Sequence, residues 1–589
     1  MKSFLTYTLA TITGIIIASL LFFIIFISAL SAMVASGDKP VDIKDKSILV
    51  LKSDVPIPDR SNENPFASFD LVNMTISNTP GLNVILNNIE KAGRDSKIEG
   101  ILIETGLMPS GWATTGEIRD ALEKFKETGK FIISYSDYVM MQEGYYLATV
   151  SDKIFIGPGS VLNFKGLSGE VMFYKNALEK LGVEVQVTRH GKFKGAVEPF
   201  ILDKLSKENA EQINAYVGSI WDHVVQTISE ARNIPVEELN IIADKLTSNT
   251  AAGALENKLV DGLLYRDALI DTLKSLSGIG EKEDLRFVTM TKYGKVADPE
   301  KVVSLKNRIA VIYASGNIVM GKGNESNIGG NHYAGVIRKA RLDSNIKAIV
   351  LRVNSPGGNA VASDIIWKEL EMAAKIKPVV ISMGNYAASG GYYIAAPGTR
   401  IYANPATISG SIGVFGLIPN AGKLMEEKLG ISTETVNTNN YSDFPSIFRP
   451  MDSYEKEVMQ LSIENIYSDF IGKVASGRKM NVDSVDSIGQ GRVWSGTSCL
   501  KNGLVDEIGG LKDAIKGAAE LANLETYSIR ELPEVEDPFT SLMNQLTGEV
   551  RLNLIKKELG SSVRFYNELM DIKNLTGIQA RLPYFIEVH

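Results

Sequence analysis

The chain of 589 residues is too long for one hydrophobic core, so its length predicts two or more domains. Its net charge of -7 is modest and no basic stripe occurs, which argues against nucleic acid as a partner. A single cysteine, Cys499, excludes an internal disulfide and any cysteine-rich metal site, and we expect neither a metal nor a cofactor.

The N-terminal segment is strongly apolar. No charged residue occurs between Ser3 and Gly37, and Thr11–Leu30 is long enough to span a bilayer as a helix. We therefore expect residues 1–37 to be a retained membrane anchor, followed by a polar linker over 38–46. A cleavable signal peptide is the alternative, because small residues occur at 28–32. No comparable apolar span follows, so the remainder is expected on one side of the membrane.

Strands and helices alternate along the first half of the chain. Apolar runs predict strands at Ser47–Lys52, Ile98–Glu104 and Lys130–Ser134. Helical periodicity predicts helices at Gly81–Lys91 and Thr115–Glu127. This alternation is typical of an α/β fold in which helices cover a parallel sheet.

The second half repeats this pattern. Its predicted strands follow in the same order at Arg308–Tyr313, Ile346–Arg352 and Pro378–Ser382. Gly144-Tyr-Tyr-Leu-Ala148 is matched 247 positions later by Gly391-Tyr-Tyr-Ile-Ala395. Matches at a nearly constant offset predict one fold duplicated in tandem. We place the two repeats at residues 47–297 and 306–525, with a C-terminal extension at 526–589.

Ser389 is a candidate nucleophile. It is expected at a strand-to-helix turn, between Ala388 and the pair Gly390-Gly391. Small neighbours leave its hydroxyl reachable, and the unpaired N–H of Gly390 at the helix start could hold an oxyanion. Ala387 stands where the Gly-x-Ser-x-Gly elbow has glycine, and an ordinary glycine-serine turn is the alternative.

Three other turns in the second half of the chain are rich in glycine. Ser355-Pro-Gly-Gly-Asn359 connects a predicted strand to a predicted helix and could supply a second oxyanion donor, the Gly358 N–H. The turns at Gly316–Gly323 and Gly410–Gly416 depart from the spacings of phosphate-binding and dinucleotide-binding motifs. They therefore predict no cofactor site.

A serine nucleophile needs a base, and comparison of the repeats indicates one. Opposite Ser389-Gly390 the first repeat has Gln142-Glu143, yet it contains Lys194 among small and apolar residues, where desolvation lowers a lysine pKa. Opposite Lys194 the second repeat has Tyr441-Ser442. Each repeat thus retains one member of a possible Ser-Lys dyad. The four histidines leave a Ser-His-Asp triad open, with His190 the best placed.

Four motifs together carry the most specific signal in the chain. They are Phe193-Lys-Gly-Ala-Val-Glu-Pro-Phe200, Arg352-Val-Asn-Ser-Pro-Gly-Gly358, Tyr386-Ala-Ala-Ser-Gly-Gly-Tyr392 and Ala403-Asn-Pro-Ala-Thr-Ile-Ser-Gly-Ser-Ile-Gly-Val414. With them the chain resembles the signal peptide peptidase A, or protease IV, family of membrane-anchored bacterial serine peptidases, in its long, duplicated form. The resemblance covers about Ser47 to Leu524, and the residues from Pro538 onward lie outside it.

The resemblance implies tandem crotonase/Clp-protease-like domains that carry a Ser-Lys dyad. It implies Ser389 as the nucleophile, Lys194 as the general base, Ser411 as the residue that orients the lysine, and Gly358 and Gly390 as backbone oxyanion donors. The implied substrates are cleaved signal peptides and other apolar peptides. It also implies a homo-oligomer, with a tetramer expected, held in the bacterial inner membrane with its catalytic part on the extracytoplasmic side.

Two other functions are compatible with parts of this pattern. One is acyl-CoA chemistry on the crotonase fold, whose oxyanion hole is alike, although the membrane segment and the Lys194 motif argue against it. The other is a catalytically inactive membrane-anchored scaffold in which Ser389 and Lys194 never meet. The sequence also leaves open whether a dyad would form within one chain or between two.

Overall fold

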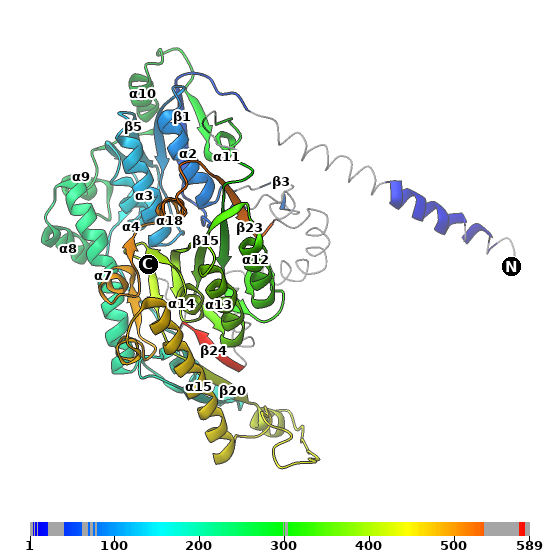
Figure 1. Cartoon of the computed structure of the whole chain (residues 1–589). Coiled ribbons are helices and arrows are strands. Elements are labelled where there is room, and N and C mark those ends of the chain that lie inside the picture. The colour runs from blue at the N-terminus through cyan, green and yellow to red at the C-terminus, as the bar shows by residue number, and fades with distance from the viewer. Residues whose placement is uncertain are drawn as a thin grey trace.

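Two β-sheets, one from each half of the chain, form the framework of the molecule (Figure 1). The computed structural model describes residues 4, 6–8, 10–21, 41–61, 69–70, 75–76, 79–298, 300, 304–324, 326–534 and 577–582. The first sheet is parallel and has the order β10-β7-β5-β4-β1-β11. Its strands are β1 (Ser47–Lys52), β4 (Ile98–Glu104), β5 (Phe131–Ser136), β7 (Lys153–Ile156), β10 (Gly262–Leu263) and β11 (Arg286–Thr289).

The second sheet repeats this order as β22-β18-β17-β15-β12-β23. Its strands are β12 (Arg308–Ser315), β15 (Ile346–Ser355), β17 (Val379–Ala388), β18 (Arg400–Ala403), β22 (Glu507–Ile508) and β23 (Ser528–Leu532). Two further strands, β19 (Ile408–Gly410) and β21 (Val493–Ser495), continue it from the end of β17. The identical order of six strands shows the duplication in three dimensions.

The central strands are apolar along their whole length because helices cover both faces of each sheet. In β1, for example, the consecutive residues Ile48, Leu49, Val50 and Leu51 are all buried. A strand that is buried on both faces reads as a continuous apolar run, which is typical of parallel sheets. This is why the strands could be predicted from short apolar runs alone.

Helices and sheets alternate in layers (Figure 1). Helix α10 (Arg266–Ser277) covers the outer face of the first sheet, and α12 (Gly330–Leu342) and α13 (Ala360–Ala374) cover the outer face of the second. Between the sheets lie α2 (Leu82–Arg94), α3 (Trp112–Lys126) and α18 (Leu511–Leu521). These three helices share one core with strands of both halves, so the two repeats pack as a single unit.

A buried ion-pair cluster links the two repeats. Arg352 on β15 is fully buried, and its Nε donates to Asp59 Oδ1 at 2.7 Å. Its Nη1 lies 2.7 Å from Glu117 Oε1 on α3, and Glu117 Oε2 accepts a hydrogen bond from the Leu511 N–H at the start of α18. Removing one member of such a cluster leaves buried charges without compensation.

We expect Arg352→Ala to lower the free energy of unfolding by about 3–5 kcal/mol, because Asp59 and Glu117 stay buried. Urea denaturation of the purified protein measures this change. The matched control is Arg338→Ala on the exposed face of α12, where a change within about 0.5 kcal/mol is expected. Equal effects of the two substitutions would contradict the account of the cluster.

A third sheet joins the two halves near the candidate site. It has the order β14-β13-β16-β24-β20-β9. Its strands are β9 (Glu184–Arg189), β13 (Asn317–Val319), β14 (Asn327–Gly329), β16 (Gly357–Asn359), β20 (Phe415–Asn420) and β24 (Gly577–Arg581). Since β9 pairs antiparallel with β20, the segment after β9, which contains Lys194, lies against the second repeat.

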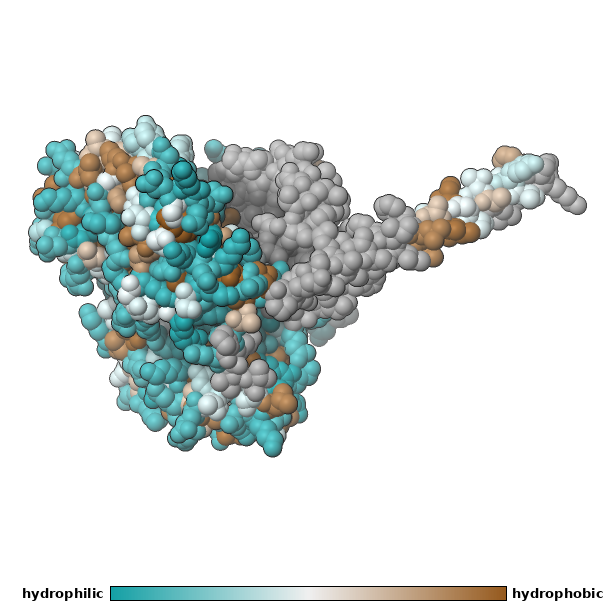
Figure 2. Space-filling view, turned by 90° about the horizontal axis from the view of Figure 1, so that it is seen from above, coloured by the Kyte–Doolittle hydropathy of each residue, from teal (hydrophilic) through white to brown (hydrophobic). Residues whose placement is uncertain are grey.

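The predicted anchor Thr11–Leu30 falls partly outside the described residues. Residues 10–21 are helical, and residues 22–40 lie outside the description. Within the described ranges, no helix combines the length and the apolarity that a membrane span needs. Figure 2 shows pale and brown side chains on the N-terminal helix, whereas the described face of the body in that view is mainly teal. The exposed apolar residues of this helix include Ile12, Ile15, Ile16, Ile17, Leu20 and Leu21.

Candidate active site

Ser389 lies at the junction of β17 and α14 (Gly390–Ala395), at the predicted strand-to-helix turn. The strand is longer than the predicted Pro378–Ser382, because its last residues, Tyr386–Ala388, pair with β19. The backbone of Ser389 has φ 55° and ψ -114°, a conformation that costs a non-glycine residue about 1–3 kcal/mol. The Ser389 N–H donates to Gly410 O at 2.8 Å and holds this turn in place.

Lys194 reaches Ser389 from the first repeat. Its Nζ lies 2.8 Å from Ser389 Oγ, and both side chains are fully buried. The contact is made within one chain and joins residues 195 positions apart. The two residues that the halves retain separately are thus in hydrogen-bonding distance of each other.

Burial lowers the pKa of Lys194 well below its ordinary value of 10.5. Desolvation penalises the ammonium form and favours the neutral amine. The described part of the chain contains no ion pair to Lys194 that would oppose this effect. A neutral amine beside a serine hydroxyl can accept its proton.

Ser411 is the third polar group around the lysine nitrogen. Lys194 Nζ donates to Ser411 Oγ at 3.0 Å and to Ser411 O at 3.1 Å. The residue is held at φ 49°, and its N–H donates to Arg492 O at 2.7 Å. Two acceptors on one residue fix the direction of the amine toward Ser389.

We expect Ser411→Ala to lower kcat/KM for peptide cleavage by about fivefold, because Lys194 loses one acceptor worth about 1 kcal/mol and keeps the other. Peptide-cleavage kinetics measure this loss. The matched control is Ser409→Ala, another buried serine, whose hydroxyl donates to Ala387 O and does not contact Lys194. An Ser411→Ala enzyme as active as the control would contradict the orienting role.

Gly358 lies close to Gly390, the residue that follows Ser389. A Cβ added to Gly390 would lie 3.2 Å from Gly358 N, so the two backbone segments are in close contact. Gly358 has φ 156°, and a Cβ there would lie 2.1 Å from Ile318 O. Only glycine fits this position. Two backbone N–H groups this close together can stabilise an oxyanion if both point at it.

A polar network behind Lys194 fixes its backbone. Glu198 is fully buried, accepts from Ser206 Oγ at 2.7 Å and from Asn209 Nδ2 at 3.0 Å. A Cβ on Gly195 would lie 2.5 Å from Asn209 Nδ2, so the glycine after the lysine makes room for this network. Within the motif Phe193–Phe200, the glutamate therefore supports the position of the lysine.

Two glycines that pack against Lys194 were not predicted from the sequence as site residues. A Cβ on Gly491 would lie 2.7 Å from Lys194 Cα, and one on Gly413 would lie 3.2 Å from Lys194 Cδ. Gly413 O also lies 3.4 Å from Ser389 Oγ. Gly413 falls in the quoted motif Ala403–Val414, whereas Gly491 has no local signal and is placed only by long-range packing.

The histidine alternative finds no support in the described part of the chain. The hydroxyl of Ser389 contacts Lys194 and Gly413 O there, and no histidine stands in the position of a base. Although His190 is near Lys194 in sequence, its Nδ1 lies 2.6 Å from Glu464 Oε2 and its ring stacks on Tyr467.

The turn of the first repeat that corresponds to the Ser389 turn has a glutamate, Glu143, and no serine. Strands β6 (Val139–Met141) and β8 (Val161–Asn163) pair there as the end of β17 pairs with β19. Helix α4 (Gln142–Ala148) follows β6 at once, and Glu143 accepts from Thr115 Oγ1 at 2.6 Å. Burial raises the pKa of Glu143 to about 8. This turn carries no nucleophilic hydroxyl, as the comparison of the repeats predicted.

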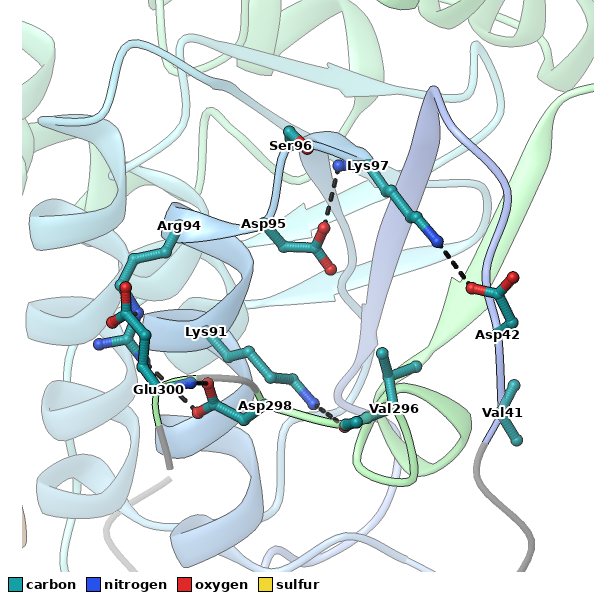
Figure 3. Close-up of a pocket in the computed structure, with 11 residues that line it drawn as sticks. Val41, Asp42, Lys91, Arg94, Asp95, Ser96, Lys97, Val296, Asp298 and Glu300 are labelled. Atoms are coloured by element: carbon teal, nitrogen blue, oxygen red, sulfur yellow. Dashed lines mark hydrogen bonds and ion pairs between the residues drawn. The ribbon is translucent and has the colours of Figure 1, made fainter. Parts of the chain in front are cut away.

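A surface pocket lies near the N-terminal ends of strands β1 and β4 in the first sheet (Figure 3). Val41 and Lys97, just before β1 and β4, are among its lining residues. Two of its basic side chains form ion pairs. Lys97 Nζ lies 2.7 Å from Asp42 Oδ1, and Arg94 Nε lies 3.1 Å from Glu300 Oε2. None of the residues predicted for the site lines it.

Comparison with known proteins identifies the family. The model of peptidase family S49 matches residues 124–280 and 371–525. Protease 4 of Salmonella typhi is 37% identical over 483 residues, which cover 80% of this chain and 76% of that protein. Protease 4 of Haemophilus influenzae is 33% identical over 514 residues, covering 85% and 83%. The chloroplastic serine protease SPPA of Arabidopsis thaliana is 33% identical over 506 residues, covering 84% and 73%.

A serine hydroxyl in contact with a buried lysine amine is an arrangement in which the amine can activate the serine as a nucleophile, as in a serine hydrolase. The chain belongs to peptidase family S49, in the long, duplicated form of the signal peptide peptidase A family, and is a serine endopeptidase. The predicted family is confirmed. Membership of this peptidase family replaces the two alternatives, an acyl-CoA enzyme and an inactive scaffold.

Proposed function

We propose that the protein is a membrane-anchored endopeptidase that uses a Ser-Lys dyad to degrade cleaved signal peptides and other apolar peptides. Ser389 is the nucleophile and Lys194 is the general base. The observation that carries this proposal is the 2.8 Å contact between Lys194 Nζ and Ser389 Oγ, both fully buried. We include in it a crotonase/Clp-protease-like fold for the repeats at 47–297 and 306–525.

In the proposed reaction, neutral Lys194 accepts the hydroxyl proton while Ser389 Oγ attacks the peptide carbonyl carbon. The Gly358 and Gly390 N–H groups donate to the oxyanion that forms. Lys194 then gives its proton to the leaving amine, and an acyl ester remains on Ser389. Water, activated by the same amine, hydrolyses this ester and releases the second product. Ser411 keeps the lysine directed at the serine throughout.

The proposed location is the bacterial inner membrane. The apolar segment Thr11–Leu30 anchors the chain to the bilayer, and the catalytic part lies on the extracytoplasmic side. The substrates are then peptides left in the same membrane, which the anchored enzyme meets without diffusing through water. We further propose that copies of the chain form a homo-oligomer, with a tetramer expected.

The proposed substrate class can be tested with two synthetic peptides of equal length. One carries an apolar run of about 20 residues, as in a membrane-spanning segment, and the other carries a polar run in its place. The purified full chain in detergent is expected to cut the first peptide within the apolar run, which mass spectrometry detects. Cleavage of the polar peptide alone would contradict the proposal.

The proposed location can be tested by cysteine labelling, because the single native cysteine, Cys499, is buried. A cysteine introduced at the exposed position Glu457 on α15 (Ser453–Arg478) gives one reactive thiol. A membrane-impermeant maleimide is expected to label Glu457→Cys in cells whose outer membrane has been permeabilised. Labelling only after the inner membrane is broken would contradict the location.

A further inference from the structure

Strand β17 is interrupted shortly before the nucleophile to which it leads. Val353 of β15 pairs with Met383 of β17, and Ser355 pairs with Ala387, so one residue of β15 stands opposite three residues of β17. These three residues, Gly384–Tyr386, form a β-bulge, which bends a strand and redirects its side chains. Since the bulge ends only three residues before the nucleophilic serine, its placement affects where the serine stands.

The bulge directs one side chain, that of Asn385, into the first repeat. Asn385 Oδ1 accepts hydrogen bonds from the N–H groups of Ala113 and Thr114, both at 3.1 Å. Its Nδ2 donates to Ser110 O at 2.8 Å and to Thr114 Oγ1 at 3.0 Å. An asparagine amide offers two donors and one oxygen with two acceptor sites. All of them are used here, on a single turn of the other repeat.

The turn that receives Asn385 is the start of helix α3, which has no side-chain cap of its own. Its N-cap residue is Gly111, with φ 85°. A Cβ on Gly111 would lie 2.6 Å from Asn385 Cγ, so a side chain there would displace the incoming amide. In the second repeat, the corresponding helix α13 is capped by its own Asn359, whose Oδ1 accepts from the Ala362 N–H at 3.0 Å. The first repeat thus takes from the second a cap that the second supplies for itself.

A second asparagine ties the same bulge to the first repeat. Asn354 Oδ1 accepts from the Tyr386 N–H at 3.2 Å, and Asn354 Nδ2 donates to Asp59 Oδ2 at 2.8 Å. Asp59 lies between β1 and α2 of the first repeat. The first repeat therefore holds the bulge at two points, through Asp59 and through the start of α3.

From these contacts we propose that Asn385 is a positioning residue of the reaction, which sets Ser389 against Lys194. The inference rests on the proposed roles of these two residues. The dyad is assembled from both repeats, so its 2.8 Å contact depends on how β17 is held to the first repeat. Asn385 holds the strand four residues before the serine. The residues between them, Tyr386–Ala388, are paired with β19 and carry that position to Ser389.

Kinetics of the purified full chain with the apolar peptide test this role. We expect Asn385→Ala to lower kcat about tenfold, because a small misplacement of reacting atoms is costly, and to change KM less than twofold. The matched control is Thr250→Ala, which removes another helix cap of the first repeat, the hydroxyl that accepts from the Gly253 N–H at the start of α9 (Ala251–Glu256). This control should lower the thermal midpoint slightly and leave kcat unchanged. An Asn385→Ala enzyme with kcat within twofold of the wild type would overturn the inference.

A second variant, Asn385→Asp, decides the question even where Asn385→Ala does not fold. Its carboxylate still accepts from both N–H groups at the start of α3, and Asp caps a helix as well as Asn does, so this variant should keep the wild-type thermal midpoint. It loses both donated bonds and brings a negative charge to Ser110 O. We therefore expect kcat to fall about threefold with KM unchanged. A wild-type kcat in Asn385→Asp would overturn the inference.

Two further variants separate this inference from the proposed function. Ser389→Ala and Lys194→Ala are assayed beside the Asn385 variants with the same peptide. If either of them cuts the peptide as the wild type does, the proposed dyad fails and the inference fails with it. If both are inactive while the Asn385 variants keep the wild-type kcat, the proposed function stands and only the positioning role is overturned.

Discussion

Lys194→Ala is expected to lower kcat/KM for an apolar peptide by at least about 10³-fold. The substitution removes the group within 2.8 Å of Ser389 Oγ that can accept its proton. No second base contacts the serine in the described part of the chain, so the hydroxyl would have to react without activation. Steady-state kinetics with the synthetic apolar peptide measure the loss.

The control for this substitution is Lys192→Ala, two positions earlier in the same loop. Lys192 is exposed, so removing it should change kcat/KM less than twofold. Urea denaturation of both variants checks that the fold survives. A folded Lys194→Ala protein that keeps more than about a tenth of the wild-type activity would show that another group serves as the base.

Ser389→Ala is expected to abolish peptide cleavage, because no oxygen remains to form the acyl ester. The fall in kcat should be at least as large as that of Lys194→Ala. The double variant should lose no more than either single variant, since residues that act as one unit show non-additive losses. The measurement is the same peptide assay, applied to the two single variants and the double variant.

Ser409→Ala again provides the matched control, since this buried serine contacts Ala387 O and Met383 rather than Lys194. It should retain most of the wild-type activity. Residual cleavage by Ser389→Ala at the wild-type bonds would mean that a different nucleophile performs the reaction. An additive loss in the double variant would mean that the serine and the lysine act in separate steps.

Sequence reasoning could predict the elements that depend on local patterns. Strand β4 was predicted with its observed bounds, because a parallel strand buried on both faces is a continuous apolar run. The pairing of Lys194 with Ser389 could be predicted by comparing the two repeats: the first lacks the serine and the second lacks the lysine. That inference needed no knowledge of the sheets, since each repeat lacks the residue that the other keeps.

Other features depend on contacts between distant segments and have no local signal. Strand β17 extends to Ala388 because β19 pairs with its end, although Gly384 and Asn385 interrupt the apolar run. Gly491 lines the lysine only because its loop folds back from beyond α15. The pairing of β24 with β16 and β20 brings together residues more than 150 positions apart in sequence, which no periodicity reveals.

The pH dependence of kcat/KM tests most directly the central claim that a buried, neutral Lys194 activates Ser389. Burial lowers the pKa of Lys194 well below 10.5, so the active neutral amine exists at every pH above this lowered value. Peptide cleavage should rise with pH through one ionisation and reach a plateau well before pH 10. A rate that stays low at neutral pH and climbs only around pH 10.5, as for an ordinary lysine, would contradict the account.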